Sequence, residues 1–294
     1  MKTKKSKKKL NSQIIKELKG KSVLITGGAG SVGSELTKTI LKYPVRTVRV
    51  LDIDEHALFK LGRTVNDSRV RLLLGNILDK ERIELAGIKA DIILHTAAIK
   101  NIEISEYNPY ETIDTNINGT LNMIRMAIKN KPKKFLNIST DKAVNSTTLY
   151  GTTKKLGEIL TTWAAMHIDS TKFASTRLGN IKETRGNVFE IWNEEMKNNK
   201  PLSITHSSME RYFFDIDDAV NFILECIPLI NHGEIFVPKM KSYKIKDLAK
   251  KISKRKKIIG LRGGEKMKEI LMTEDENKIA EERKNMWIIK NKNF

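Results

Sequence analysis

The stretch SVLITGGAGSVG, residues 22–33, decides the fold of this chain. Its first five residues have the composition and the length of a buried strand. The glycines that follow, Gly27, Gly30 and Gly33, have the spacing of a turn that joins a strand to a helix and binds a dinucleotide. The first glycine permits the tight bend, the second lets the backbone approach a pyrophosphate, and the third lets helix and strand pack closely. The sequence therefore predicts a dinucleotide at the N-terminus of the following helix.

An acidic residue ends the second apolar run of the sequence. Asp52 lies in VRVLDI (48–53), about twenty residues after the glycine turn. A carboxylate at this place accepts hydrogen bonds from the ribose hydroxyls of adenosine and repels a 2′-phosphate. The sequence therefore predicts NAD, and not NADP, as the cofactor.

Strand-like and helix-like segments alternate through the first 180 residues. The apolar runs are 22–26, 48–53, 71–75, 91–96, 134–139 and 172–178. Such alternation favours a parallel sheet with helices on both faces. We expect a Rossmann-type, doubly wound α/β domain over residues 20–180. Residues 181–294, where the pattern weakens, should form mainly a small C-terminal substrate-binding subdomain, with some return to the Rossmann body.

Composition and charge limit the class of protein. The chain has 294 residues and a formal net charge of +19, and six of its first ten residues are lysine. We expect a basic, flexible tail over residues 1–19, but no nucleic-acid partner, because no aromatic residues interleave the charges. The single cysteine, Cys226, argues against a disulfide framework or a cysteine-rich metal site, so no metal is expected. No apolar run reaches ~18 residues, so we expect no integral membrane contact and a cytoplasmic location.

A tyrosine and a lysine stand four residues apart in a helix expected after the fifth strand. This spacing places Tyr150 and Lys154 on one helix face. A neighbouring ammonium stabilises a phenolate, so we expect Lys154 to lower the pKa of Tyr150 and make it a usable base. Two hydroxyl residues, Ser139 and Thr140, end the preceding strand.

Together with the glycine turn, this pair resembles the extended short-chain dehydrogenase/reductases, from about residue 20 to near the C-terminus. HTAAIKNI (95–102) resembles the family segment whose small residues let the backbone approach the dinucleotide. NPYETIDTNINGTLNM (108–123) resembles the family helix that carries an asparagine. The resemblance implies that NAD is bound by Gly27, Gly30, Ser31, Val32, Gly33, Asp52, Asn76, Ile77, Ala97, Ala98, Lys100, Asn116, Tyr150 and Lys154.

The stretch STDKA (139–143) indicates a subgroup of this family. With LYGTTK (149–154) it is similar to UDP-N-acetylglucosamine 4,6-dehydratases of the polysaccharide-biosynthesis (CapD-like) group. The resemblance implies that Lys142 is the base at sugar C5, Asp141 the acid at C6, and Tyr150 the base at the C4 hydroxyl. Thr140 and Lys154 complete the implied catalytic set. The implied ligands of the UDP-sugar substrate are Lys100, Asn180, Arg185, Arg211, Arg262 and Glu265.

Two other functions stay open at this point. A UDP-sugar 4-epimerase of the same superfamily would use the same cofactor, and only the Asp141–Lys142 pair separates it from the dehydratase in sequence. The other alternative is a non-catalytic protein that binds a dinucleotide or a nucleic acid, against which the intact Tyr150–Lys154 pair argues. The resemblance also implies a homodimer or larger homo-oligomer, joined through the helix that begins near Asn108 and the Tyr150 helix.

Overall fold

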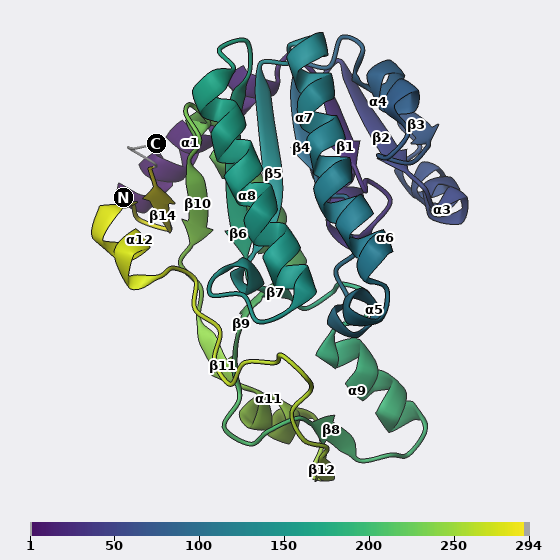
Figure 1. Ribbon diagram of the computed structural model, residues 1–294, viewed down its shortest axis with the longest axis vertical. Coiled ribbons are helices and arrows are strands. Elements are labelled where there is room, and N and C mark those ends of the chain that lie inside the picture. The colour runs from purple at the N-terminus through teal and green to yellow at the C-terminus, as the bar shows by residue number, and fades with distance from the viewer. Residues whose placement is uncertain (1, 291–294) are drawn as a thin grey trace.

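A nine-stranded, mainly parallel sheet forms the body of the protein (Figure 1). The computed structural model describes residues 2–290, with side chains from residue 10 onward. The strand order is β13-β14-β10-β6-β5-β4-β1-β2-β3. The strands are β1 Ser22–Thr26, β2 Thr47–Asp52, β3 Val70–Leu74, β4 Ile92–His95, β5 Lys134–Thr140, β6 Lys172–Leu178, β10 Ile235–Pro238, β13 Ala280–Glu282 and β14 Met286–Ile289. The six apolar runs of the sequence are therefore β1 to β6, and the predicted Rossmann-type fold is confirmed.

The order of the strands in the sheet reverses at β1. This strand pairs in parallel with β2 on one side and with β4 on the other. Parallel pairing continues outward to β3 and to β10, and β14 then pairs antiparallel with β10 and β13. In such sheets a crevice opens outside the carboxyl ends of the strands where the order reverses. The glycine turn follows β1 at this point.

Helices cover both faces of the sheet. Three of them, α2 (Ser31–Ile40), α3 (Glu55–Val65) and α10 (Ile216–Cys226), share one apolar core with the sheet. Another three, α4 (Lys80–Gly87), α7 (Gly119–Asn130) and α8 (Leu149–His167), bury the opposite face and lie in front in Figure 1. Two short helices, α5 (Ile102–Tyr107) and α6 (Pro109–Ile113), lead through the π-helix Asp114–Asn118 into α7.

A smaller unit lies below the sheet in Figure 1. It contains α9 (Val188–Lys197), β8 (Leu202–Ile204), α11 (Ile245–Ile252) and β12 (Lys256–Ile258), and its core is centred on the fully buried Trp192. Between this unit and the body, β7 (Asn180–Ile181), β9 (Glu210–Phe214) and β11 (Ser242–Lys244) form a three-stranded sheet. A last helix, α12 (Glu274–Ile279), precedes β13. The boundary at residue 180 stays a prediction, and residues 291–294 of the predicted subdomain lie outside the described residues.

The N-terminal segment differs from the expected flexible tail. Residues Lys2–Leu18 form α1, and the side chains of Ile14 and Leu18 are only 5% and 0% exposed, in the core that α10 shares. Leu10 packs against the same core. These apolar residues recur every four positions and therefore lie on one helix face, a pattern that the lysine run obscures in the sequence. The expectation of a flexible tail is corrected for residues 10–18, and Met1 lies outside the described residues.

None of the helices within residues 2–290 is both long enough and apolar enough to cross a membrane.

Replacing Leu18 with Ala should lower the free energy of unfolding by about 2–5 kcal/mol, because the smaller side chain leaves a cavity between α1 and the body. Chemical denaturation measures the change. Ile15→Ala is the matched control, because Ile15 on the same helix is 39% exposed, and should cost less than about 1 kcal/mol. Equal losses in the two variants would contradict the docking of α1 on the core.

Candidate functional site

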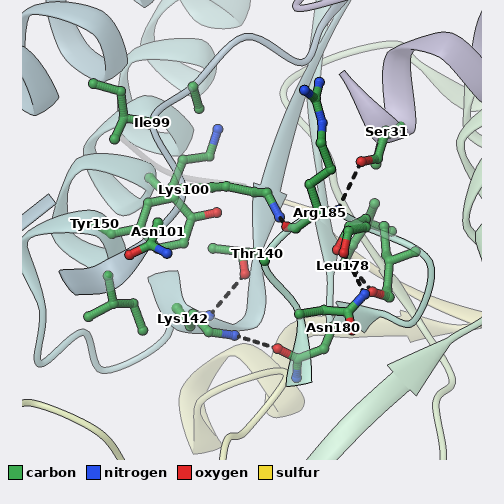
Figure 2. A pocket seen from close by; sticks show the side chains of 18 of the residues that line it. Ser31, Ile99, Lys100, Asn101, Thr140, Lys142, Tyr150, Leu178, Asn180 and Arg185 are labelled. Carbon is green, nitrogen blue, oxygen red and sulfur yellow. Dashed lines mark hydrogen bonds between the residues drawn. The ribbon is translucent and has the colours of Figure 1, made fainter. Parts of the chain in front are cut away.

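A cavity of about 710 Å³ follows the carboxyl edge of the sheet (Figure 2). Its wall contains the glycine turn, the ends of β4 and β5, the start of α8, and loops from the last third of the chain. Its volume lies within the range of ligand-binding pockets. The cavity is lined by all of the residues that the sequence predicts as catalytic, cofactor-binding or substrate-binding, with the exceptions of Asn116 and Asp141.

The glycine turn forms the wall of the cavity at the N-terminus of α2. Gly27 has a φ of +63°, and a Cβ atom there would lie 2.7 Å from the backbone of Ala97. A Cβ atom on Gly33 would lie 2.4 Å from the carbonyl oxygen of Gly27. Both positions therefore require glycine. The first N–H groups of a helix have no partner within the helix, so the turn offers donors to an anion in the cavity.

The carboxylate of Asp52 is fixed beside this turn. It accepts hydrogen bonds from the backbone N–H of Ala29 at 2.9 Å and of Asp54 at 3.1 Å, and it lines the cavity. Asn76 and Ile77 line the same part of the cavity wall beyond β3. A strand-end carboxylate beside a helix N-terminus with free amides fits the ribose and the pyrophosphate of a dinucleotide.

Asn116 does not line the cavity, and its contact with the cofactor stays a prediction. Its amide oxygen accepts a hydrogen bond from the N–H of Ile99 at 2.8 Å. Its amide nitrogen donates to the carbonyl oxygen of Ile99 at 2.9 Å and to the hydroxyl of Thr153 at 3.0 Å. The side chain is therefore occupied within the protein, where it ties the segment after β4 to α8.

Tyr150 and Lys154 reach the cavity because α8 starts against the end of β5. The hydroxyl of Thr148 accepts a hydrogen bond from the N–H of Gly151 and caps the helix. A Cβ atom on Gly151 would lie 2.3 Å from the carbonyl oxygen of Lys142, so the helix and the turn Asp141–Ala143 are in close contact. This contact brings Tyr150 close to the acid and base that follow β5.

The pKa of Tyr150 differs from the sequence-based expectation. Burial raises the pKa of the phenol above its usual range, the charge of Asp141 raises it further, and a hydrogen bond with Thr140 acts in the opposite direction. Burial lowers the pKa of Lys154 to about 8, although the charge of Glu158 acts to raise it. The expected lowering by Lys154 is therefore not found, because the phenol is removed from water and faces a carboxylate.

Asp141 and Lys142 form an ion pair in the cavity wall. The ammonium of Lys142 donates to Asp141 Oδ1 at 3.0 Å and to Asn180 Oδ1 at 3.1 Å, the second of which is visible in Figure 2. Asp141 Oδ1 also accepts a hydrogen bond from the hydroxyl of Thr140 at 3.0 Å. Asp141 itself is 0% exposed, and its Oδ2 atom has no hydrogen-bond partner among the described residues. Lys142 and Thr140 thus line the cavity, whereas Asp141 lies within its wall.

Arg185, a predicted substrate ligand, lies against the glycine turn. Its backbone N–H donates to the hydroxyl of Ser31 at 3.2 Å, and its guanidinium donates to the carbonyl oxygen of Ala29 at 3.5 Å. The ammonium of Lys100 donates to the carbonyl oxygen of Arg185 at 2.7 Å (Figure 2). Arg185 therefore lies beside the glycine turn, and its contact with the substrate stays a prediction.

The other predicted arginines come from β9 and the C-terminal segment. The guanidinium of Arg211, which is 7% exposed, donates to Glu265 Oε1 at 3.3 Å. Arg262 Nε lies 3.0 Å from Oε1 of Glu103 on α5. Planar guanidinium groups that line a cavity are suited to bind a diphosphate. Both arginines are held by carboxylates in this structure.

Four charged residues line the cavity although they are absent from the predicted site: Asp54, Glu103, Lys266 and Glu269. Lys266 Nζ donates to the carbonyl oxygen of Val144 at 2.7 Å and lies 3.5 Å from Glu269 Oε2. The charged run GGEKMKE (263–269) contains two of them, but its sequence alone does not reveal that it folds against the turn after β5. Within residues 2–290, no cluster of three or more His, Cys, Asp and Glu side chains could hold a metal ion.

Known proteins resemble the chain over nearly its whole length. Residues 23–291 match a family model described as polysaccharide biosynthesis protein. The chain is 38% identical over 277 residues to an inverting UDP-N-acetylglucosamine 4,6-dehydratase of Campylobacter jejuni, which covers 92% of this chain and 83% of that protein. It is 34% identical over 281 residues to a UDP-glucose 4-epimerase of Rickettsia bellii, which covers 92% of this chain and 82% of that protein.

A solved structure supports the same relationship. Pen from Bacillus thuringiensis is 34% identical to this chain and superposes with a TM-score of 0.90, over 94% of this chain and 90% of that protein. The chain thus has the glycine turn and the Tyr150–Lys154 helix, and residues 23–291 match the family model. It belongs to the polysaccharide biosynthesis protein family, in the CapD-like group of the extended short-chain dehydrogenase/reductases.

Proposed function

We propose that the protein is an NAD-dependent nucleotide-sugar 4,6-dehydratase, a lyase that acts on UDP-N-acetylglucosamine. The observation that carries this proposal is the Asp141–Lys142 ion pair at the cavity wall, close to Tyr150. Removing a proton and a hydroxyl from adjacent carbons requires a base and an acid, and this pair can supply both. The Campylobacter jejuni dehydratase, at 38% identity, supports the same assignment.

The residues beside the glycine turn would hold the cofactor. The N–H groups of Ser31, Val32 and Gly33 would bind the pyrophosphate, and Asp52 would bind the ribose hydroxyls of adenosine. Bound NAD would supply a hydride acceptor at sugar C4 and a hydride donor at C6, with no net redox change. The proton transfers belong to side chains of this chain.

Tyr150 would take the proton of the C4 hydroxyl. Burial and Asp141 raise the pKa of this phenol, so its anion needs compensation before it can act as a base. The hydrogen bond with Thr140 favours the anion, and a positive charge on Lys154, one helical turn further on, would favour it once substrate and cofactor fill the cavity.

Lys142 and Asp141 would carry out the elimination across C5 and C6. A ketone at C4 makes the C5 proton acidic, and neutral Lys142 would remove it. Transfer of one proton across the 3.0 Å contact turns the ammonium and carboxylate into an amine base and a carboxylic acid. The acid would reach the departing C6 hydroxyl through Thr140, whose hydroxyl lies between Asp141 and the cavity.

Lys142→Ala and Asp141→Asn should each slow water loss from UDP-N-acetylglucosamine by about 10²–10⁴-fold, because each removes one partner of the acid–base pair. Lys142→Ala should also abolish exchange of the C5 proton with deuterated solvent, which proton NMR measures. Tyr150→Phe should depress every step, including oxidation at C4. Lys38→Ala is the control, since Lys38 pairs with Glu35 on α2, outside the cavity.

A UDP-sugar 4-epimerase is the second candidate, and the Rickettsia bellii relative at 34% identity favours it. Epimerisation at C4 needs Tyr150 and a cofactor but no acid–base pair at C5 and C6. Near-normal turnover in both Lys142→Ala and Asp141→Asn, with loss of activity in Tyr150→Phe, would reject the dehydratase and leave the epimerase.

Replacing Asp52 with Asn should reduce the preference for NAD over NADP at least about tenfold, which corresponds to ~1.4 kcal/mol. The amide keeps the shape of the side chain but removes the charge that repels a 2′-phosphate. Equilibrium binding of both dinucleotides to the purified protein provides the measurement. Asp67→Asn, at a carboxylate paired with Arg69 outside the cavity, is the control. Unchanged discrimination in Asp52→Asn would show that another group selects the cofactor.

We propose further that two copies of the chain associate through α5, α6 and α8. Large apolar side chains are exposed there, among them Tyr107 at 87%, Tyr110 at 81% and Trp163 at 47%. Both α5 and α6 contact α8, and exposed large apolar side chains on adjacent helices favour an interaction surface. Trp163→Glu should shift the protein toward a monomer in sedimentation velocity at micromolar concentration, whereas Phe59→Glu, an exposed position on α3, should not. A wild-type monomer under these conditions would contradict the association.

A further inference from the structure

Behind the cavity wall, a buried arginine joins three elements of the fold. Arg177 on β6 is 0% exposed. Its guanidinium donates two hydrogen bonds of 2.8 Å to Glu158 on α8 and two of 2.7 Å to Glu276 on α12. Burial acts to raise the pKa of Glu276, but its bonds to Arg177 outweigh this effect and hold the pKa at about 2. The arginine is therefore shared by two carboxylates.

Glu158 connects this arginine to the cavity. It is 0% exposed, and its Oε1 atom accepts a hydrogen bond of 2.7 Å from the hydroxyl of Ser139, which lines the cavity. It also continues the spacing of four residues that starts with Tyr150 and Lys154, so all three side chains lie on one face of α8. The carboxylate thus links Arg177 to Ser139 in the cavity wall and lies on the helix face that carries Tyr150 and Lys154.

The charges around Lys154 come from few groups. Burial lowers the pKa of Lys154 to about 8, and the charge of Glu158 opposes this shift. The neighbouring His95 on β4 has a pKa lowered to about 3 by burial and then by Lys154, so it is neutral near pH 7. Tyr150 on the same helix has a raised pKa and is neutral as well. The charge of Glu158, one helical turn from Lys154, therefore favours a charged Lys154. The cations that lie against Glu158 itself are Arg177 at 2.8 Å and Lys155 at 3.6 Å, and Lys155 also lies 3.7 Å from Glu276.

We propose that Glu158 is a positioning residue, whose carboxylate holds the ammonium of Lys154 in its charged form and fixes the Ser139 hydroxyl at the cavity wall. Arg177 and Glu276 hold Glu158 in place. The inference rests on the proposed function, which gives charged Lys154 its task beside Tyr150. Its direct test needs no substrate, so the two proposals can fail separately.

Glu158→Gln keeps the size of the side chain and an oxygen acceptor for Ser139, but removes the charge. In protein labelled with ¹³C at lysine Cε, NMR titration follows Lys154, and the signal missing from Lys154→Arg identifies it. Lys154 in Glu158→Gln should bind its proton at least about tenfold more weakly than in the wild type. Glu276→Gln is the matched control: it removes a carboxylate from the same arginine, but on α12, and should leave the titration near that of the wild type.

An unchanged Lys154 titration in Glu158→Gln, or equal changes in the two glutamine variants, would overturn the proposal. Glu158→Asp covers the case in which Glu158→Gln does not fold. Its carboxylate is withdrawn by one methylene group, so Lys154 should again bind its proton more weakly, and an unchanged titration would overturn the proposal equally.

The reaction supplies a second measurement. The alkaline limb of the kcat profile should move to lower pH in Glu158→Gln and stay in place in Glu276→Gln. The alkaline limb could stay in place in Glu158→Gln although Lys154 binds its proton more weakly. This result would show that the charge of Lys154 does not limit catalysis, and it would still support the control of that charge by Glu158. Absence of any turnover in the wild type would instead reject the proposed function.

Discussion

The burial of Arg177 between two carboxylates is the interaction on which the closure of the site depends. One carboxylate, Glu158, belongs to α8 on the face of the sheet, and the other, Glu276, belongs to α12 near the end of the described chain. Removing one partner of a buried ion pair typically costs about 3–5 kcal/mol, because the remaining charge is left uncompensated. The segment that carries Arg262 and Glu265 leads directly into α12. Arg177 therefore anchors the end of this segment, whereas Arg262 and Lys266 anchor its start through Glu103 and Val144.

The residues that line the cavity come from segments that are far apart in the sequence. Crowding between Gly27 and Ala97 fixes the turn after β1, and the contact of Gly151 with Lys142 fixes the start of α8. The wall also carries several cations, including Lys100 and Arg211. Positive charge in a concave site with low-dielectric walls attracts a diphosphate, which agrees with a nucleotide-sugar substrate.

Sequence reasoning succeeds here where local spacing decides the structure. The glycine turn, the end of β2 at Asp52 and the helix face of Tyr150 and Lys154 follow from period and spacing. Long-range contacts could not be predicted in this way. The bonds of Arg177 join residues 19 and 99 positions apart, and no local pattern reports them. The same reason explains why Asn116 turns to Ile99 instead of the cavity, and why burial outweighs Lys154 at Tyr150.

The identity of the product tests the proposed reaction most directly. Purified protein is incubated with UDP-N-acetylglucosamine and NAD, and the nucleotide sugar is analysed by mass spectrometry and NMR. The account predicts a product that has lost one molecule of water and carries a ketone at C4 and a methyl group at C6. A product of unchanged mass with an inverted C4 would contradict it.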